Sequence, residues 1–185
     1  LRMIGTAAAL AATAAAVAYA LRTLRDRRTP PPEAESAPAP SGPRGLKVGD
    51  VILHGADEAW LGGMLEANEE GRFVVRLFHA PGSPWVAQLD ARAERIAYVE
   101  AIELADGAVP AELVRKGIRH HLERRAEVQL SRAGEDVPEG DAADYVCLTG
   151  SAGRVVLSFD IGEKRHAFAG EVIPRAMLEV LPGDD

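Results

Sequence analysis

From residue 44 onward, the chain consists of short apolar runs separated by Gly, Asp, Asn and Pro every eight to twelve residues. This spacing is typical of an all-β domain. The clearest alternation lies in residues 122–131, where one side is mostly apolar and the other polar, as a half-buried strand requires. The pattern predicts strands at 46–53, 58–66, 72–79, 85–89, 94–104, 118–123, 125–132, 143–149, 154–160, 164–169 and 171–181.

These strands predict a β-barrel or sandwich-like module with one short helix. The helix is expected in the segment PAELVRK at 110–116, which begins with Pro and is followed by Gly117. Residues 71–78 resemble 153–159, and two related β subdomains would explain the similarity, although a generic hairpin strand explains it equally well. We therefore predict a first β subdomain at 44–104, a connector at 105–116 and a second β subdomain at 117–185.

The amino-terminal segment has a different pattern, because residues 3–21 are uncharged and mostly Ala. A helix that crosses a membrane needs about 20 apolar residues, so we predict a transmembrane helix at 1–24. Four arginines follow it between positions 22 and 28, and basic residues beside such a helix stay on the cytoplasmic side. We expect a single-pass protein of the bacterial inner membrane whose carboxy-terminal module is cytoplasmic. The alternative is a cleaved signal peptide with Ala18-Tyr19-Ala20 at its cleavage site.

Residues 25–43 are predicted to be a basic flank and a proline-rich linker. The linker contains six prolines from Pro30 to Pro43, and such segments form semi-rigid spacers that extend ~3.1 Å per residue. In the predicted helix, alanines recur every fourth residue from Ala8 to Ala20. Such a stripe allows helices to approach closely and to form a homo-oligomer, but a segment this rich in Ala also contains the spacing by chance.

The net charge of the module limits the kinds of partner that it can bind. The 142 residues from Arg44 onward hold 16 basic and 25 acidic side chains, a net charge of −9. This charge repels phosphate backbones, so we expect no nucleic-acid binding. The single cysteine, Cys147, excludes an internal disulfide and fits a reducing compartment. It lies in an apolar strand pattern and is interpreted as a buried small residue.

No pattern in the sequence identifies a catalytic, cofactor-binding or metal-binding residue. The five histidines lack metal-ligand spacing, and nucleotide-binding loops are absent from the sequence. Trp60 and Trp85 are the two tryptophans, and we expect both to fill the β core, the alternative being that either lines a binding groove. His54 lies near Asp57, and the two side chains could form a weak metal site after folding. The candidate binding surface is therefore Trp60, Trp85, His54 and Asp57.

Several short motifs, marked mainly by Gly and aromatic positions, recur in a characteristic order along the module. They are Leu46-Lys47-Val48-Gly49-Asp50-Val51-Ile52, Val109-Pro110, Gly117-Ile118-Arg119-His120-His121-Leu122, Arg125, Val128, Gly134, Tyr145, Gly153-Arg154 and Phe168-Ala169-Gly170. This order resembles the bacterial domain-of-unknown-function family 4178, and the similarity covers most of residues 46–181. The resemblance implies an accessory role at the membrane, associated with envelope stress, and supplies no catalytic residues.

Two functions remain open on these grounds. The first is a membrane-anchored, non-enzymatic β module that binds a protein partner at the cytoplasmic face of the membrane. The second is a domain that binds a small molecule, such as a polyamine or another cation, or a weak hydrolase; an acidic surface attracts cations.

Overall fold

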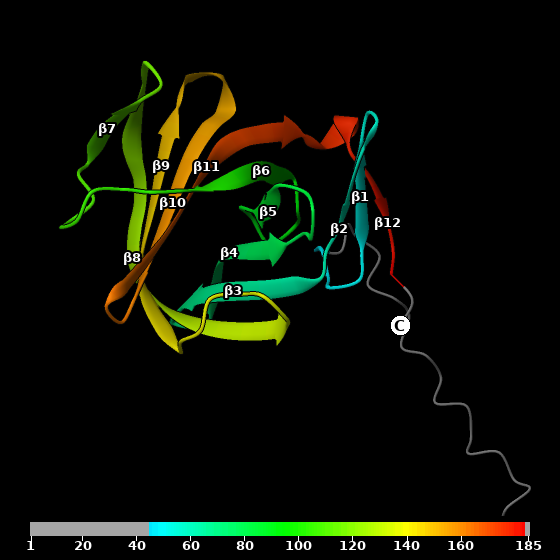
Figure 1. Ribbon diagram of the computed structural model, residues 1–185, viewed down its shortest axis with the longest axis horizontal. Helices are drawn as coiled ribbons and strands as arrows, with labels where there is room; N and C mark the ends of the chain where they lie inside the picture. Colours follow the sequence, from blue (N-terminus) through cyan, green and yellow to red (C-terminus); the bar gives the residue numbers. More distant parts are fainter. Residues whose placement is uncertain (1–44, 184–185) are drawn as a thin grey trace, which may run out of the picture. The chain divides into compact units, whose positions relative to one another are not determined.

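The computed structural model describes residues 45–183, and these residues form an all-β structure (Figure 1). The predicted transmembrane helix at 1–24 and the linker at 25–43 lie outside the described residues. Among residues 45–183, no helix is long and apolar enough to cross a membrane. The strands are β1 (Val51–His54), β2 (Asp57–Trp60), β3 (Gly63–Glu69), β4 (Arg72–His79), β5 (Trp85–Gln88), β6 (Arg95–Ile102), β7 (Glu112–Arg115), β8 (Ile118–Gly134), β9 (Ala142–Gly150), β10 (Arg154–Ile161), β11 (Lys164–Pro174) and β12 (Glu179–Leu181).

Eight of these strands close into a barrel of antiparallel neighbours. The order is β3-β4-β5-β6-β11-β10-β9-β8, and β8 pairs again with β3 to complete the ring. Each half of the chain therefore contributes a meander of four strands, and the halves meet at β6–β11 and at β3–β8. The barrel strands of the predicted segments 44–104 and 117–185 therefore join in one barrel, whereas β1, β2 and β12 from the same segments form a separate sheet.

The strand β8 shows how local sequence shapes the barrel. It spans the predicted strands 118–123 and 125–132 as one element, with an irregular register between Leu122 and Arg124. A bulge at this point lets the strand bend, so its first part pairs with β7 and its last part with β3. Glu123 lies at the bulge, and its carboxylate accepts hydrogen bonds of 2.9 and 3.3 Å from the Arg95 guanidinium of β6.

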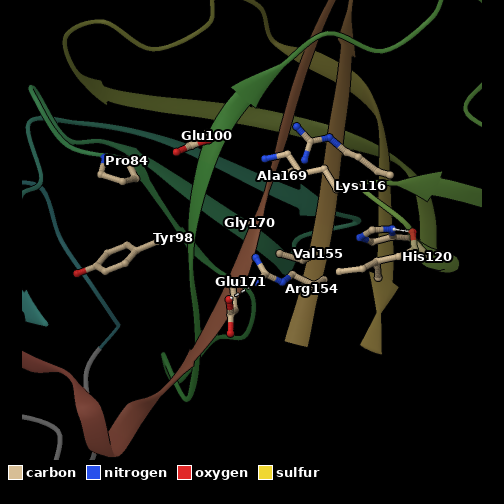
Figure 2. Close-up of a pocket in the computed structure, with 12 residues that line it drawn as sticks. Pro84, Tyr98, Glu100, Lys116, His120, Arg154, Val155, Ala169, Gly170 and Glu171 are labelled. Atoms are coloured by element: carbon tan, nitrogen blue, oxygen red, sulfur yellow. Dashed lines mark hydrogen bonds and ion pairs between the residues drawn. The ribbon is translucent and has the colours of Figure 1, made fainter. Parts of the chain in front are cut away.

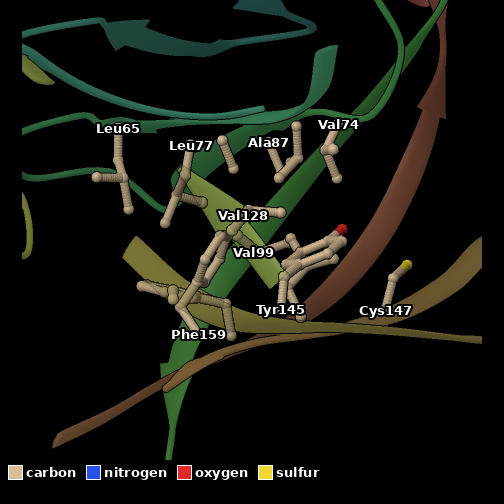
Figure 3. Close-up of a cluster of buried hydrophobic side chains, with 14 of the residues drawn as sticks. Leu65, Val74, Leu77, Ala87, Val99, Val128, Tyr145, Cys147 and Phe159 are labelled. Atoms are coloured by element: carbon tan, nitrogen blue, oxygen red, sulfur yellow. The ribbon is translucent and has the colours of Figure 1, made fainter. Parts of the chain in front are cut away.

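The barrel interior is filled by apolar side chains. Figure 3 shows Leu65, Leu77 and Ala87 pointing toward Tyr145 and Phe159, which come from the opposite wall. Cys147 belongs to the same cluster and is buried, as the sequence predicted. Burial and the nearby Glu123 carboxylate raise the pKa of the Cys147 thiol to about 12, which makes this group a poor nucleophile.

Two further segments cover the outside of the barrel. The sheet β12-β1-β2 packs its inner face on β4, β5 and β6 through a second apolar cluster that includes Ile52, Ala59, Phe78 and Ile96. The connector between β6 and β8 covers β9, β10 and β11 through a third cluster around Leu148.

The expected short helix at 110–116 is wrong, because this segment contains the strand β7. Lys116 and Gly117 both have positive φ (49° and 77°), which builds a tight hairpin turn between β7 and β8. Leu113 of β7 packs against the third cluster. Arg125 and Arg165 hold the connector in place, since their guanidinium groups donate hydrogen bonds to backbone carbonyls of Val109 and of Ala105 and Gly107, respectively.

Candidate functional site

The four residues of the predicted binding surface fall into three different environments. His54 and Asp57 are paired across the β1–β2 hairpin. Trp60 is at the other end of β2, and Trp85 begins β5 in the barrel. The structure therefore brings His54 and Asp57 together, and it places Trp60 and Trp85 at separate sites.

His54 and Asp57 face the barrel side of their hairpin and lie near Tyr98 of β6. The rings of His54 and Tyr98 are 5.8 Å apart. Burial, with a contribution from the Asp57 carboxylate, raises the pKa of Tyr98. The Tyr98 hydroxyl is buried and has no hydrogen-bond partner among residues 45–183.

Trp60 does not belong to the core, contrary to expectation, because 53% of its surface is exposed. The reason is strand alternation: Ala59 is the residue of β2 that packs on the barrel, so its neighbour Trp60 points outward. The register places Trp60 and Leu181 on either side of Val51, in one row across the sheet. We call this row, together with the adjacent outward-facing Leu53, the apolar face.

The apolar face is unusual for an outer sheet surface. Antiparallel sheets with one solvated face normally alternate apolar residues inward with polar residues outward. Here Leu181 is 41% exposed in the same row as Trp60, with Val51 between them. Glu58 and Glu179 are paired with Leu53 on either side, so two carboxylates border the apolar row. The sequence did not predict Leu181 or Leu53 as part of a site. The β1–β2 hairpin places Leu53 on the same face as Trp60, and the long-range pairing of β1 with β12 adds Leu181.

Trp85 points into one end of the barrel, which we call the mouth. Its indole ring lies 4.9 Å from the His79 ring and 5.1 Å from the Phe168 ring, measured between centroids. The mouth encloses about 530 Å³. It is lined by Trp85, Ala101, Asp136, Val137, Pro138, Glu139, Ile161, Lys164, His166 and Phe168.

The loop between β8 and β9 forms one side of the mouth, and two glycines position it. A Cβ atom on Gly134 would lie 2.3 Å from the Gly62 carbonyl oxygen, and one on Gly140 would lie 2.2 Å from Ile161 Cγ2. Both glycines also have positive φ. Val137, between them, packs against the core cluster of the barrel. Gly134 is one of the positions that resemble family 4178, but no local pattern in the sequence predicts that this loop is part of a site.

A second depression lies on the outer wall between β6, β11, β10 and the β7–β8 hairpin (Figure 2). It measures about 500 Å³ and carries charges of both signs. Some of its polar groups already have partners: Arg154 and Glu171 form an ion pair of 2.9 Å, and His120 Nδ1 lies 3.1 Å from the Ile118 carbonyl oxygen. Figure 2 shows Tyr98 pointing away from this groove, so its hydroxyl does not serve it.

The described part of the chain contains no group of three His, Cys, Asp or Glu side chains arranged to hold a metal ion.

The Asp160 carboxylate accepts hydrogen bonds from Arg165, and this contact lowers the pKa of Asp160. It therefore holds the connector in place through Arg165.

No protein-family profile matches the chain, and neither a curated protein nor a solved structure shows significant similarity to it. The resemblance to family 4178 accordingly stays a prediction.

Proposed function

We propose that the protein is a non-enzymatic accessory module that binds a protein partner at the cytoplasmic face of a bacterial inner membrane. The observation that carries this proposal is the apolar face, where Trp60 and Leu181 are exposed on either side of Val51. Exposed apolar patches rimmed by polar residues mark interaction sites, and tryptophan is enriched among the residues that dominate binding energy.

The charges around the face define the partner's chemistry. Glu58 and Glu179 border the apolar row, and the module as a whole is acidic. A partner segment with an apolar anchor flanked by Lys or Arg would complement this surface. The membrane anchor at 1–24, the cytoplasmic orientation and the role in envelope stress belong to the same proposal and rest on the sequence.

Site-specific photocrosslinking in cells tests the docking surface. A benzophenone amino acid at position 60 is expected to give a discrete adduct with one membrane-associated protein. The control is the same probe at Val114, which is also exposed but lies on β7. Identical adduct patterns from the two positions, or no protein adduct from position 60 in correctly folded protein, would contradict the proposal. Protease protection in spheroplasts tests the orientation separately, because a cytoplasmic module should resist external protease.

A second candidate function is the binding of a small organic molecule or cation. The aromatic-lined mouth favours it, since ligand sites recur in the mouths of β-barrels and typically measure ~300–1,000 Å³.

A further inference from the structure

The mouth combines a rigid aromatic wall with a charged rim. Phe168 belongs to the barrel core and is buried, and Trp85 lies beside it with one surface toward the cavity. The loop that forms the opposite side is fixed by Gly134 and Gly140 and by the packing of Val137. Because both sides are positioned by core contacts, the cavity is formed before any ligand arrives, which lowers the entropy cost of binding.

The rim favours a positive ligand. Asp136 and Glu139 line the mouth together with one ammonium group, that of Lys164. Burial and the neighbouring Lys164 lower the pKa of His166, which disfavours a positive charge on its imidazole. The His79 Nδ1 atom lies 3.9 Å from the Asp136 carboxylate, and Asp136 lines the cavity. Carboxylates therefore outnumber the fixed cations among the lining residues.

Aromatic rings and carboxylates recognise the same kind of ligand. The face of an indole ring attracts a cation through its quadrupole, and Trp is the strongest side chain in this respect. An apolar ligand body can pack on Trp85 and Phe168 while its charged end reaches the carboxylates of the loop.

We propose that the mouth binds a small organic cation, a molecule with an apolar or aromatic body and one ammonium group. The ammonium group lies toward Asp136 and Glu139, and the body packs against Trp85. This inference deepens the second candidate function and is independent of protein docking at the apolar face, which lies at a separate site.

A fluorescence titration of the full-length protein tests the proposal. The variant Trp60→Phe leaves Trp85 as the sole tryptophan, so the emission signal reports on the mouth. The same substitution replaces the exposed indole of the apolar face with a smaller ring. The probes are 2-phenylethylammonium, the uncharged 2-phenylethanol of similar size, and the anion phenylacetate. We expect a saturable change in Trp85 emission with the ammonium compound, at a Kd at least fivefold lower than that of the alcohol.

Two substitutions locate the charge recognition. Glu139→Gln and Asp136→Asn should each weaken binding of the ammonium compound about fivefold, the upper range for a partly exposed charge pair, and should leave the alcohol unchanged. Asp144→Asn, on the outer wall of the barrel, is the matched control and should change neither. Calorimetric titration with the same probes provides a readout that does not depend on emission from Trp85.

Several results would overturn the inference. Equal affinity for the ammonium compound and the alcohol would remove the charge preference. Tighter binding of phenylacetate would assign the rim to Lys164 and an anionic ligand. No saturable signal by fluorescence or calorimetry in folded protein would show that the mouth does not bind this class. Each of these results leaves the crosslinking test at position 60 unaffected, so the two proposals fail separately.

Discussion

Gly170 lies where the two halves of the chain meet, and replacing it with Ala tests the barrel directly. Gly170 of β11 pairs with Val99 of β6. A Cβ atom at this position would lie 1.8 Å from the Tyr98 carbonyl oxygen. Real Cβ contacts essentially never fall below 3.0 Å, so the two strands would have to move apart by the missing 1.2 Å. The clash is with backbone, which cannot rotate away as a side chain can.

The expected cost follows from this geometry. Forcing extra volume into a packed interior costs up to about 3 kcal/mol, and loss of pairing along β6–β11 would add to it. For a domain of this size, 3 kcal/mol lowers Tm by about 10 °C. Gly170 does not have positive φ, so the penalty is steric and not conformational.

Gly162→Ala is the matched control, and thermal unfolding followed by circular dichroism is the assay. Gly162 has a φ of 59°, and a Cβ atom there would meet nothing within 4 Å. Its replacement should cost only the strain of a left-handed residue, roughly 1 kcal/mol. If Gly170→Ala lowers Tm no more than Gly162→Ala does, β6 and β11 are not in contact as described, and the barrel junction is wrong.

Three further predictions concern groups whose environment the structure defines. Because its pKa is about 12 and not the usual 9.0, Cys147 should react with Ellman's reagent at pH 8 about 1,000-fold more slowly in folded than in urea-unfolded protein; rates within tenfold would show that the thiol is accessible. Tyr98→Phe removes a buried hydroxyl that has no partner within residues 45–183, so it should raise the free energy of unfolding by about 1 kcal/mol; a loss of stability would mean that the hydroxyl is satisfied. The Arg165 hydrogen bond lowers the pKa of Asp160 below 3.8 in the folded protein. The stability that this contact gives the fold is therefore fully present above pH 3.8 and is lost as the pH falls through the pKa of the folded state. Wild type should therefore exceed Asp160→Asn in Tm at pH 6, and the difference should shrink toward pH 3; a constant difference would exclude this linkage.

Local sequence patterns predicted much of the strand content. The alternation in 122–131 identified β8, and the predicted break near residue 124 coincides with its bulge. By contrast, the Pro and Gly that frame 110–116 suggested a helix. There the packing of Leu113 and the hairpin turn at Lys116-Gly117 override the local preference.

The contacts between distant parts of the chain could not be predicted from local sequence patterns. Closure of the barrel depends on Gly63 meeting Gly134 and on β6 meeting β11, and neither pairing produces a local signal. The exposure of Trp60 depends on which side of β2 faces the barrel, and composition does not reveal it. The mouth likewise requires Trp85 and the loop at 136–139 to converge from distant parts of the chain.

The pairing of β1 with β12 has a consequence for how the protein is made. Val51 cannot pair with Leu181 until the ribosome has synthesised almost all of residues 45–183. Amino-terminal residues emerge first during synthesis, so any targeting of that end would happen while the sheet that carries Trp60 still lacks its last strand. The complete apolar face would then form only after β12 has been synthesised, and translation products that stop before β12 would lack the Leu181 part of it.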